Sequence, residues 1–397
     1  MIVVNGREYR TWDDVLTVNG TVVKYVYVND IYVYPEIAQV VDILTYTDDS
    51  VVNHDPAWPS ISSGCYRSQS LKDVYFPSCS RIGESAFIDC SALIDADFPV
   101  CSYIDDLAFR RCSSLANINF PICSYIGEGT FRGCMSLTDI NFPNCSYIDT
   151  DAFAYCRSLE SINFPVCSYV GQRAFDECTL LKSANFPVCS YLGYTAFEYC
   201  SALTYANFPV CDRIRDNTFW SCVSLVSVSF PLCSRIGSYA FFSCSSLKSA
   251  YFPACTYIES YAFNGCKSLT IADFPICSRV NSCAFQYDSR LESINFPACA
   301  YIGSYAFNYC NALTTVELPA CSYIYSRAFA SCRSLTSVYL LSNIMCSLYS
   351  DAANVFGNTP ITGYQSKSGN VFVPQSLYND YINDSYWATI SSAIVGI

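Results

Sequence analysis

The sequence predicts an α/β solenoid, a stack of short repeated coils, and a strict 22-residue period is the main evidence for it. The dipeptide Phe-Pro recurs at this period from Phe76-Pro77 to Phe296-Pro297 and once more as Leu318-Pro319. Leu recurs in register from Leu71 to Leu335, and Phe from Phe87 to Phe329. Because each coil of such a stack contacts mainly its neighbours, we expect long continuous faces rather than a deep pocket.

Composition restricts the compartment and the classes of partner. Of the 397 residues, 52% are hydrophobic and 14% are charged, and polar residues interrupt every long apolar run, so we expect no membrane insertion. The amino terminus, MIVVNGREYRTW, lacks the basic stretch and apolar core of a signal peptide. The net charge of −12 and the scattered basic residues, apart from Arg110, Arg111 and Arg132, predict no nucleic-acid partner.

The 26 cysteines follow the same period. Twelve recur from Cys79 to Cys321 and eleven from Cys90 to Cys332, where Asp288 takes one position of the second column. Stacked residues lie roughly 4.8 Å apart, whereas the Cβ atoms of a disulfide lie about 3.5–4.5 Å apart. The repeats contain no Cys-x2-Cys pair, which is the spacing that would indicate a zinc site. We therefore expect buried free thiols rather than disulfides or metal ligands, and no cofactor. Reactive thiols are expected chiefly at Cys65, Cys283 and Cys346.

The first half of a coil, represented by residues 93–104, predicts a short strand. Asp95 and Asp97 alternate with the inward positions, which is the period-2 pattern of a half-buried strand. Pro99 has no N–H to donate, so strand pairing should end there, and Ile104 should re-enter the core. The inward positions of the strand are Leu93, Ala96 and Phe98, with Cys101 following.

The second half of the coil predicts a single helical turn. Ala108, Phe109 and Cys112 have the spacing at which side chains share one face of a helix. Ser113-Ser114 should close this turn before Leu115 starts the next strand. A coil is therefore expected to contain one strand and one inward-facing helical turn.

The repeating unit F-P-x-C-S-Y-I-G-x-x-A-F-x-x-C-x-S-L-T-S-I-N resembles the BspA-type leucine-rich repeat, and the match extends over residues 71–340. The resemblance implies a curved right-handed solenoid with a parallel β-sheet on its concave side. It also implies a non-catalytic protein that binds host or partner macromolecules, of a kind found among surface and secreted proteins of gut and oral bacteria. The Cys after Phe-Pro-x departs from the commoner family pattern and supports a buried ladder of thiols.

Residues 1–40 differ from the repeats and predict a small β-rich module. Val4-Asn5-Gly6, Val18-Asn19-Gly20 and Val28-Asn29-Asp30 are hairpin turn signals between β-branched and aromatic runs. The stretch 22–36 resembles short β-rich leader segments of phage and prophage tail-associated proteins. The module is therefore expected either to dock on the first coil or to attach the solenoid to a larger particle.

A solenoid needs caps, because its terminal coils would otherwise expose core and sheet edges. We expect residues 41–70 to form an N-terminal cap or first irregular coil, residues 71–340 the solenoid, and residues 341–397 a C-terminal cap. The residues expected to cover the last coil are Val371, Val373, Leu377, Tyr381, Trp387, Ile390 and Ile394.

The outward strand residues are the first candidates for partner binding. One column is polar and repetitive, and a structural ladder of stacked amides is the alternative explanation for it. Tyr205 and Tyr251 add apolar faces to this acidic groove, which suits sugars and polar protein loops better than lipids. The repetitive polar positions are Asp97, Asn119, Asn141, Asn163, Asn185 and Asn207.

A second candidate surface is aromatic. Trp220 and Phe242 occupy equivalent positions on the helical side of adjacent coils. Exposed aromatic patches often mark interaction sites. Another column, which runs from Tyr103 to Tyr323 with Arg in some coils, is expected to pack along an edge of the repeat. Near Trp220 and Phe242, a neighbouring column holds Tyr239, Tyr261 and Tyr305.

The sequence contains no catalytic constellation. It has one histidine, His54, and neither a Gly-rich phosphate loop nor a G-x-S-x-G motif. Asp95 and Asp97 could serve a glycosidase only in a cleft, which an alternating strand does not form. We therefore predict a non-enzymatic binding or adhesion protein, extracellular or on the cell surface, that recognises a protein or glycan. The alternative is a phage or prophage virion protein, associated with the tail and attached through residues 1–40.

Overall fold

The computed structural model describes residues 42–54, 58–366 and 368–397, together with six short strands within residues 2–32. These six strands pair antiparallel as three hairpins, and each pair flanks one of the predicted turn signals, so the predicted pairings are confirmed. Their bounds are β1 (Ile2–Val4) with β2 (Arg7–Tyr9), β3 (Leu16–Val18) with β4 (Thr21–Val23), and β5 (Tyr27–Val28) with β6 (Ile31–Tyr32).

The solenoid begins with an antiparallel pair of strands. β7 (Asp42–Tyr46) pairs antiparallel with both β8 (Val51–His54) and β10 (Leu71–Tyr75). β7 therefore covers the edge that β10 would otherwise expose. After β10 each coil adds a strand parallel to the preceding one, at the register that places Ile118 beside Ala96.

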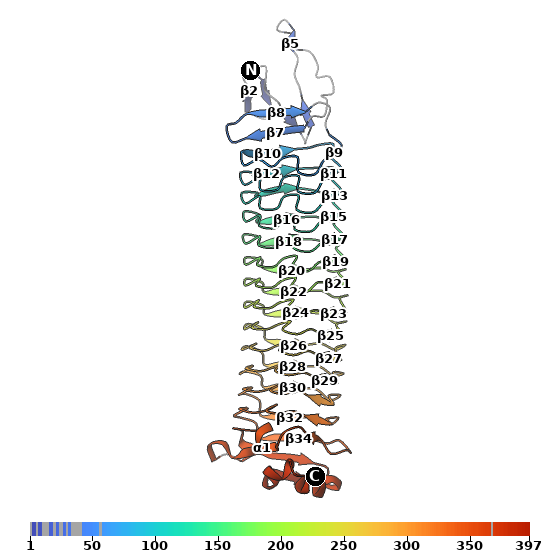
Figure 1. Cartoon of the computed structure of the whole chain (residues 1–397), viewed down its shortest axis with the longest axis vertical. Helices are drawn as coiled ribbons and strands as arrows, with labels where there is room; N and C mark the ends of the chain where they lie inside the picture. The colour runs from blue at the N-terminus through green and yellow to red at the C-terminus, as the bar shows by residue number, and fades with distance from the viewer. Residues whose placement is uncertain are drawn as a thin grey trace.

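Three-residue strands form one row along the stack (Figure 1). Hydrogen bonding divides the row into short parallel sheets, β10-β12-β14, β16-β18, β20-β22-β24, β26-β28-β30 and β32-β34, the first and last of which are extended by the ends of the chain. The strands are β12 (Asp95–Asp97), β14 (Asn117–Asn119), β16 (Asp139–Asn141), β18 (Ser161–Asn163), β20 (Ser183–Asn185), β22 (Tyr205–Asn207), β24 (Ser227–Ser229), β26 (Ser249–Tyr251), β28 (Ile271–Asp273), β30 (Ser293–Asn295), β32 (Thr315–Glu317) and β34 (Ser337–Tyr339).

A second row of two-residue strands was not predicted from the sequence. It consists of two seven-stranded parallel sheets, one ending at β21 and the next starting at β23. The strands are β9 (Ser60–Ile61), β11 (Arg81–Ile82), β13 (Tyr103–Ile104), β15 (Tyr125–Ile126), β17 (Tyr147–Ile148), β19 (Tyr169–Val170), β21 (Tyr191–Leu192), β23 (Arg213–Ile214), β25 (Arg235–Ile236), β27 (Tyr257–Ile258), β29 (Arg279–Val280), β31 (Tyr301–Ile302), β33 (Tyr323–Ile324) and β35 (Ser347–Leu348).

The helical turn expected in each coil does not form, and this prediction was wrong. Leu107 and Arg111 have left-handed backbones, with φ of 58° and 60°, and every coil up to the one containing Ser331 repeats this pair. Leu107 N–H donates to the Glu128 carbonyl and Phe109 N–H to the Thr130 carbonyl, at 2.8 and 2.9 Å. Because these bonds point to the next coil, the segment forms consecutive turns instead of an α-helix.

The stack is close to straight in Figure 1, with little of the curvature that the resemblance implies. Bonded rows run along the three-residue strands, the two-residue strands and the left-handed turns. The rise per coil is therefore set by the same hydrogen-bond spacing on several sides, which limits bending. The parallel solenoid of 22-residue coils itself is confirmed.

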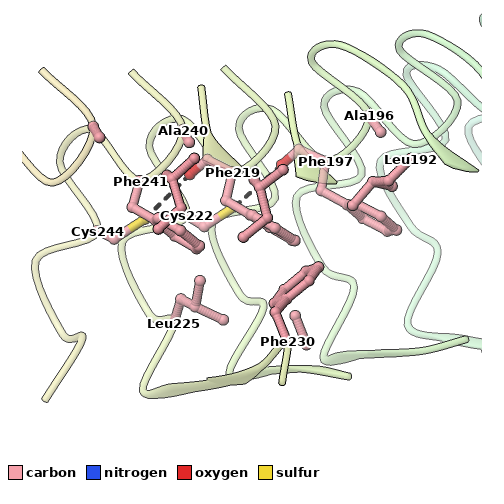
Figure 2. Packing of buried hydrophobic residues seen from close by; sticks show 14 of the residues in the cluster. Leu192, Ala196, Phe197, Phe219, Cys222, Leu225, Phe230, Ala240, Phe241 and Cys244 are labelled. Atoms are coloured by element: carbon pink, nitrogen blue, oxygen red, sulfur yellow. Dashed lines mark hydrogen bonds between the residues drawn. The ribbon is translucent and has the colours of Figure 1, made fainter. Parts of the chain in front are cut away.

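Two columns of Phe fill the core. Phe98 stacks on Phe120 with ring centroids 5.2 Å apart, and Phe109 stacks on Phe131 at 5.3 Å. The columns meet edge to face, as Phe98 does with Phe109 at 6.0 Å. Figure 2 shows this arrangement around Phe219 and Phe230. Stacked and edge-on pairs are the favourable geometries for aromatic rings, so the core gains from every added coil.

The two cysteine columns are buried, as predicted, and their cysteines are free thiols, not joined in disulfides. In the first column Cys101 Sγ donates to the Tyr103 carbonyl at 3.3 Å. In the second, Cys222 Sγ donates to the Phe197 carbonyl of the preceding coil at 3.1 Å (Figure 2). Burial raises the pKa of the Cys222 thiol well above its usual value. The thiols are thus small core groups that also satisfy backbone carbonyls.

Two of the three cysteines expected to react are also buried. Cys65 is exposed, but Cys283 and Cys346 are buried. The Cys346 N–H donates to the Tyr381 hydroxyl and its carbonyl accepts from Trp387 Nε1, both at 2.8 Å. The expectation for Cys346 was wrong because the C-terminal segment covers it.

The C-terminal segment closes the last coil. β36 (Asn370–Val373) continues the row from β34, and β37 (Ile394–Gly396) pairs with β36. The covering residues named from the sequence are buried, with Leu377 partly so. Among the described residues no helix is long and apolar enough to cross a membrane. The remaining elements are α1 (Ala352–Val355), α2 (Tyr378–Asn383) and the 3-10 helices η1 (Pro360–Thr362), η2 (Tyr364–Ser366), η3 (Gln375–Leu377) and η4 (Trp387–Ala393).

Candidate binding surfaces

The polar strand column forms hydrogen-bonded pairs rather than a continuous ladder. In each pair an Asn Nδ2 donates to the side-chain oxygen of the preceding coil, and each pair lies within one short sheet. Among the described residues no such bond crosses from one sheet to the next in this column. The amides therefore help to hold neighbouring coils together, which supports the structural explanation. The pairs are Asn119–Asp97, Asn163–Asn141, Asn207–Asn185 and Asn295–Asp273, at 2.7, 2.8, 2.8 and 2.7 Å.

Tyr205 and Tyr251 lie on this strand face but do not form one aromatic group. Tyr205 is 40% exposed and Tyr251 is 61% exposed. β24 lies in sequence order between their strands, and it presents Ser227 and Ser229. The two rings are therefore separate apolar points on a polar surface.

The turn side of the coils carries a contiguous aromatic cluster, defined here as Tyr199, Trp220, Tyr239, Phe242 and Tyr261. Trp220 stacks on Tyr239 and meets Phe242 edge to face, each at 5.4 Å between centroids. Tyr239 stacks in turn on Tyr261 at 4.7 Å. All five side chains are half-buried or exposed. The structure thus brings together four of the aromatic residues predicted for this side, and Tyr199 extends the cluster by one coil.

Tyr305, expected near this surface, has a different role. Tyr305 lies two coils beyond Tyr261, and its hydroxyl accepts a hydrogen bond from Arg327 Nη1 at 3.0 Å. The aromatic cluster therefore ends before it reaches Tyr305.

The Tyr column along the second row of strands is a packing feature, as predicted. Tyr147 and Tyr169 stack at 4.2 Å, and Tyr169 and Tyr191 at 4.3 Å. Where Arg81, Arg235 and Arg279 replace Tyr, the guanidinium covers a neighbouring ring, as Arg81 covers Tyr103 at 4.5 Å. Rings and guanidinia thus continue the same stack along the edge of the repeat.

This row is interrupted between β21 and β23, and a pocket of about 260 Å³ lies there. The Arg215 guanidinium lies 3.8 Å from the Tyr191 ring centroid and donates to the Leu192 carbonyl at 2.9 Å. Arg213 and Arg235 also line the pocket. Sequence reasoning missed this basic cluster because Arg235 lies about one repeat away from Arg213 and Arg215. Alignment of the repeats would have revealed it.

Two buried carboxyl groups interrupt the regular columns. Burial, reinforced by Glu198 and Glu177, raises the pKa of the Asp176 carboxyl to about 7. Asp288 replaces a cysteine and is fully buried, and burial raises its pKa well above the ordinary value. Both groups are core features, since neither faces an open cleft.

Asp95 and Asp97, considered as a carboxylate pair, are each engaged by a neighbouring amide. Asn117 Nδ2 donates to Asp95, and Asn119 Nδ2 donates to Asp97. Within the described part of the chain, no group of three or more His, Cys, Asp or Glu residues is arranged to hold a metal ion. Both carboxylates of this pair are therefore held in hydrogen bonds to the next coil.

Coils of 22 residues, with inward Leu and Phe and a parallel strand in each, define a leucine-rich-repeat solenoid. The chain belongs to the BspA-type leucine-rich repeat family. The family model described as "BspA type Leucine rich repeat region (6 copies)" matches residues 59–178, 147–270 and 256–381.

Solved structures similar to this chain include a leucine-rich repeat protein from Bacteroides ovatus, with 20% identity over 90% of this chain and 99% of that chain and a TM-score of 0.49. A leucine rich cell surface protein from Faecalibacterium prausnitzii has 18% identity over 90% and 97%, with a TM-score of 0.43. No protein with a curated description matches the chain. Similarities at this level carry no conclusion about ligand or activity.

Proposed function

We propose that this protein is a non-enzymatic binding or adhesion protein that recognises a protein or glycan through the side of its solenoid. Leucine-rich repeats typically serve as binding scaffolds. The aromatic cluster is the observation that carries the proposal, because large rigid side chains supply most of the energy at interfaces.

The position of the aromatic cluster in the stack supports this proposal. The column that contains Trp220 and Phe242 holds Asp176 and Glu198 in the preceding coils and Asn264 in the following one. Asp176 and Asn264 are buried and Glu198 is half-buried, so Trp220 and Phe242 are the aromatic side chains that this column offers to a partner.

We propose that the solenoid acts outside the cell that makes it, on a cell surface or a virion. The virion alternative depends on residues 22–36, of which 24–26, 29–30 and 33–36 lie outside the described residues. Identification of the neighbouring genes would separate the two, since tail genes on both sides favour the virion role.

The experiment is a comparison of two double variants on arrays of glycans and extracellular-matrix proteins. Trp220→Ala with Phe242→Ala removes two of the five rings of the aromatic cluster, and the same column already holds Ala154 and Ala330 in other coils. Tyr205→Ser with Tyr251→Ser is the matched change on the strand face. We expect the first variant to lose the signals of the wild type and the second to retain them. Retention by the first and loss by the second would move the site to the strands.

A further inference from the structure

The pocket at the interrupted row carries an inference that goes beyond the proposed function, because it rests on other residues. Two other arginines of this row, Arg81 and Arg235, pair with a carboxylate on the next coil. Arg81 Nη2 donates to Asp105 Oδ2 at 2.8 Å, and Arg235 Nε donates to Glu259 Oε1 at 3.0 Å. Asp105 and Glu259 occupy the same position of the repeat. For Arg213 the corresponding residue is Gly237, which has no side chain to offer.

Arg213 also lacks the second contact that arginines make in this row, which is packing of the guanidinium on an aromatic ring. Arg279, which likewise faces a glycine position, lies 3.8 Å from the Tyr301 ring centroid and donates to Asn281 Oδ1 at 3.0 Å. Arg213 is exposed, and among the described residues it has neither a stacked ring nor a carboxylate within ion-pair distance. Its neighbour on the adjacent strand β25 is Arg235. Like charges placed directly opposite one another are destabilising, and an anion between them would relieve this repulsion.

The chain cannot fill the missing position itself. A Cβ at Gly237 would lie 2.5 Å from Asp216 Oδ1 and 2.6 Å from the carbonyl carbon of Arg215, so any side chain there would collide with both. Asp216 Oδ1 itself accepts a hydrogen bond from the Ser238 N–H at 2.9 Å. Space of about 260 Å³ remains, lined by Arg213, Arg215 and Arg235. The pocket thus provides three guanidinium groups against the two carboxylates of Asp216 and Glu259, in a chain whose net charge is −12.

The size and lining of the pocket point to the class of ligand. It is smaller than the roughly 300–1,000 Å³ of pockets for drug-sized molecules, so it suits a single sugar unit. Tyr194 lines it and is 47% exposed, which offers a flat apolar surface beside the guanidinia. Arginine binds carboxylates in a fork geometry. We propose that this pocket binds the carboxylate of an acidic sugar, a uronic or sialic acid residue, which takes the place of the carboxylate missing at position 237.

The test measures binding of methyl glucuronide and of the methyl glycoside of N-acetylneuraminic acid by ligand-observed NMR and titration calorimetry. Neutral methyl glucoside and acetate are the comparison probes. We expect at least one acidic sugar to bind, more weakly as salt is raised, with no binding of the glucoside. Equal binding of the glucoside would overturn the role of charge. Acetate that binds as tightly as the acidic sugar would overturn the assignment to a sugar.

Arg213→Tyr is the decisive variant, because Tyr occupies this position in Tyr191, Tyr257 and other coils. We expect it to weaken binding of the acidic sugar at least tenfold. Arg81→Tyr makes the same change of charge at a distant coil and should bind as the wild type does. Wild-type affinity in Arg213→Tyr would overturn the proposal. Trp220→Ala with Phe242→Ala should leave sugar binding intact, which separates this pocket from the function proposed for the aromatic cluster.

Discussion

Trp220 stacks on Tyr239 of the next coil, with ring centroids 5.4 Å apart and 14° between the ring planes. Tyr239 has a left-handed backbone, with φ of 56°, at a position of the repeat where another coil has Gly129. A left-handed backbone costs an L-residue on the order of 1–2 kcal/mol. The fold imposes this conformation in every coil, and here an aromatic residue rather than glycine occupies it. Contacts with Trp220 and Tyr261 help to offset the strain.

The left-handed turns predict a stabilising substitution. Ser243 has φ of 59° at the position that Gly265 occupies in the next coil, so Ser243→Gly removes strain. We expect a gain of about 0.5–1 kcal/mol in the free energy of unfolding, since the greater freedom of glycine in the unfolded chain offsets part of the relief. Denaturant unfolding measures it. Ser246→Gly, in the same coil but without positive φ, should destabilise, and a gain there would contradict this explanation.

Removal of one ring from the Phe stack should destabilise the adjoining coils most. Phe175 is fully buried and stacks between Phe153 and Phe197, at 5.3 and 5.2 Å. Phe175→Ala should cost about 3–5 kcal/mol, as truncation of a buried Phe does. Hydrogen exchange should quicken most in the adjoining coils. Val188→Ala, at an exposed position, is the control and should change little. Uniform acceleration along the whole stack would argue against nearest-neighbour stability.

Thiol chemistry tests the buried columns. In the native state we expect one rapidly reacting group, Cys65, with Cys283 slower because it is 7% exposed. Denaturation without reductant should release all 26 thiols to a colorimetric reagent. A denatured count near zero would mean that the columns are oxidised, and many fast thiols in the native state would mean that the columns are open.

The buried Asp176 carboxyl predicts a pH dependence. Its pKa is raised to about 7, because burial and two nearby carboxylates disfavour the charged form. The folded state therefore holds a proton that the unfolded state releases near pH 4. The contribution of Asp176 to the free energy of unfolding is thus full below that pH, and it falls as the pH rises toward 7. Asp176→Asn should remove this fall, and Asn264 and Asn308 already occupy the same column. Parallel pH profiles of the two proteins in denaturant unfolding would contradict the assignment.

The repeat period made the inward positions predictable, from Leu71 to Phe329, because only stacked coils place every repeat in the same environment. The turn conformation at Leu107 and Arg111 was not predictable, because the apolar spacing of this segment also fits a helical turn. The backbone hydrogen bonds to the next coil decide between the two, and the sequence does not show them. The second row of strands and its interruption at Arg215 depend on contacts between coils. Burial of Cys346 depends on the position of Trp387, which lies outside the repeat.

The most direct test of the central claim is hydroxyl-radical footprinting of the protein with the partner that the arrays identify. Oxidation of each aromatic side chain is measured by mass spectrometry with and without that partner. The proposed function predicts that oxidation of Trp220, Tyr239 and Phe242 falls on binding, while that of Tyr251 and Tyr323 does not change. Protection of Tyr251 with no change at Trp220 and Phe242 would contradict it and place the binding surface on the strands.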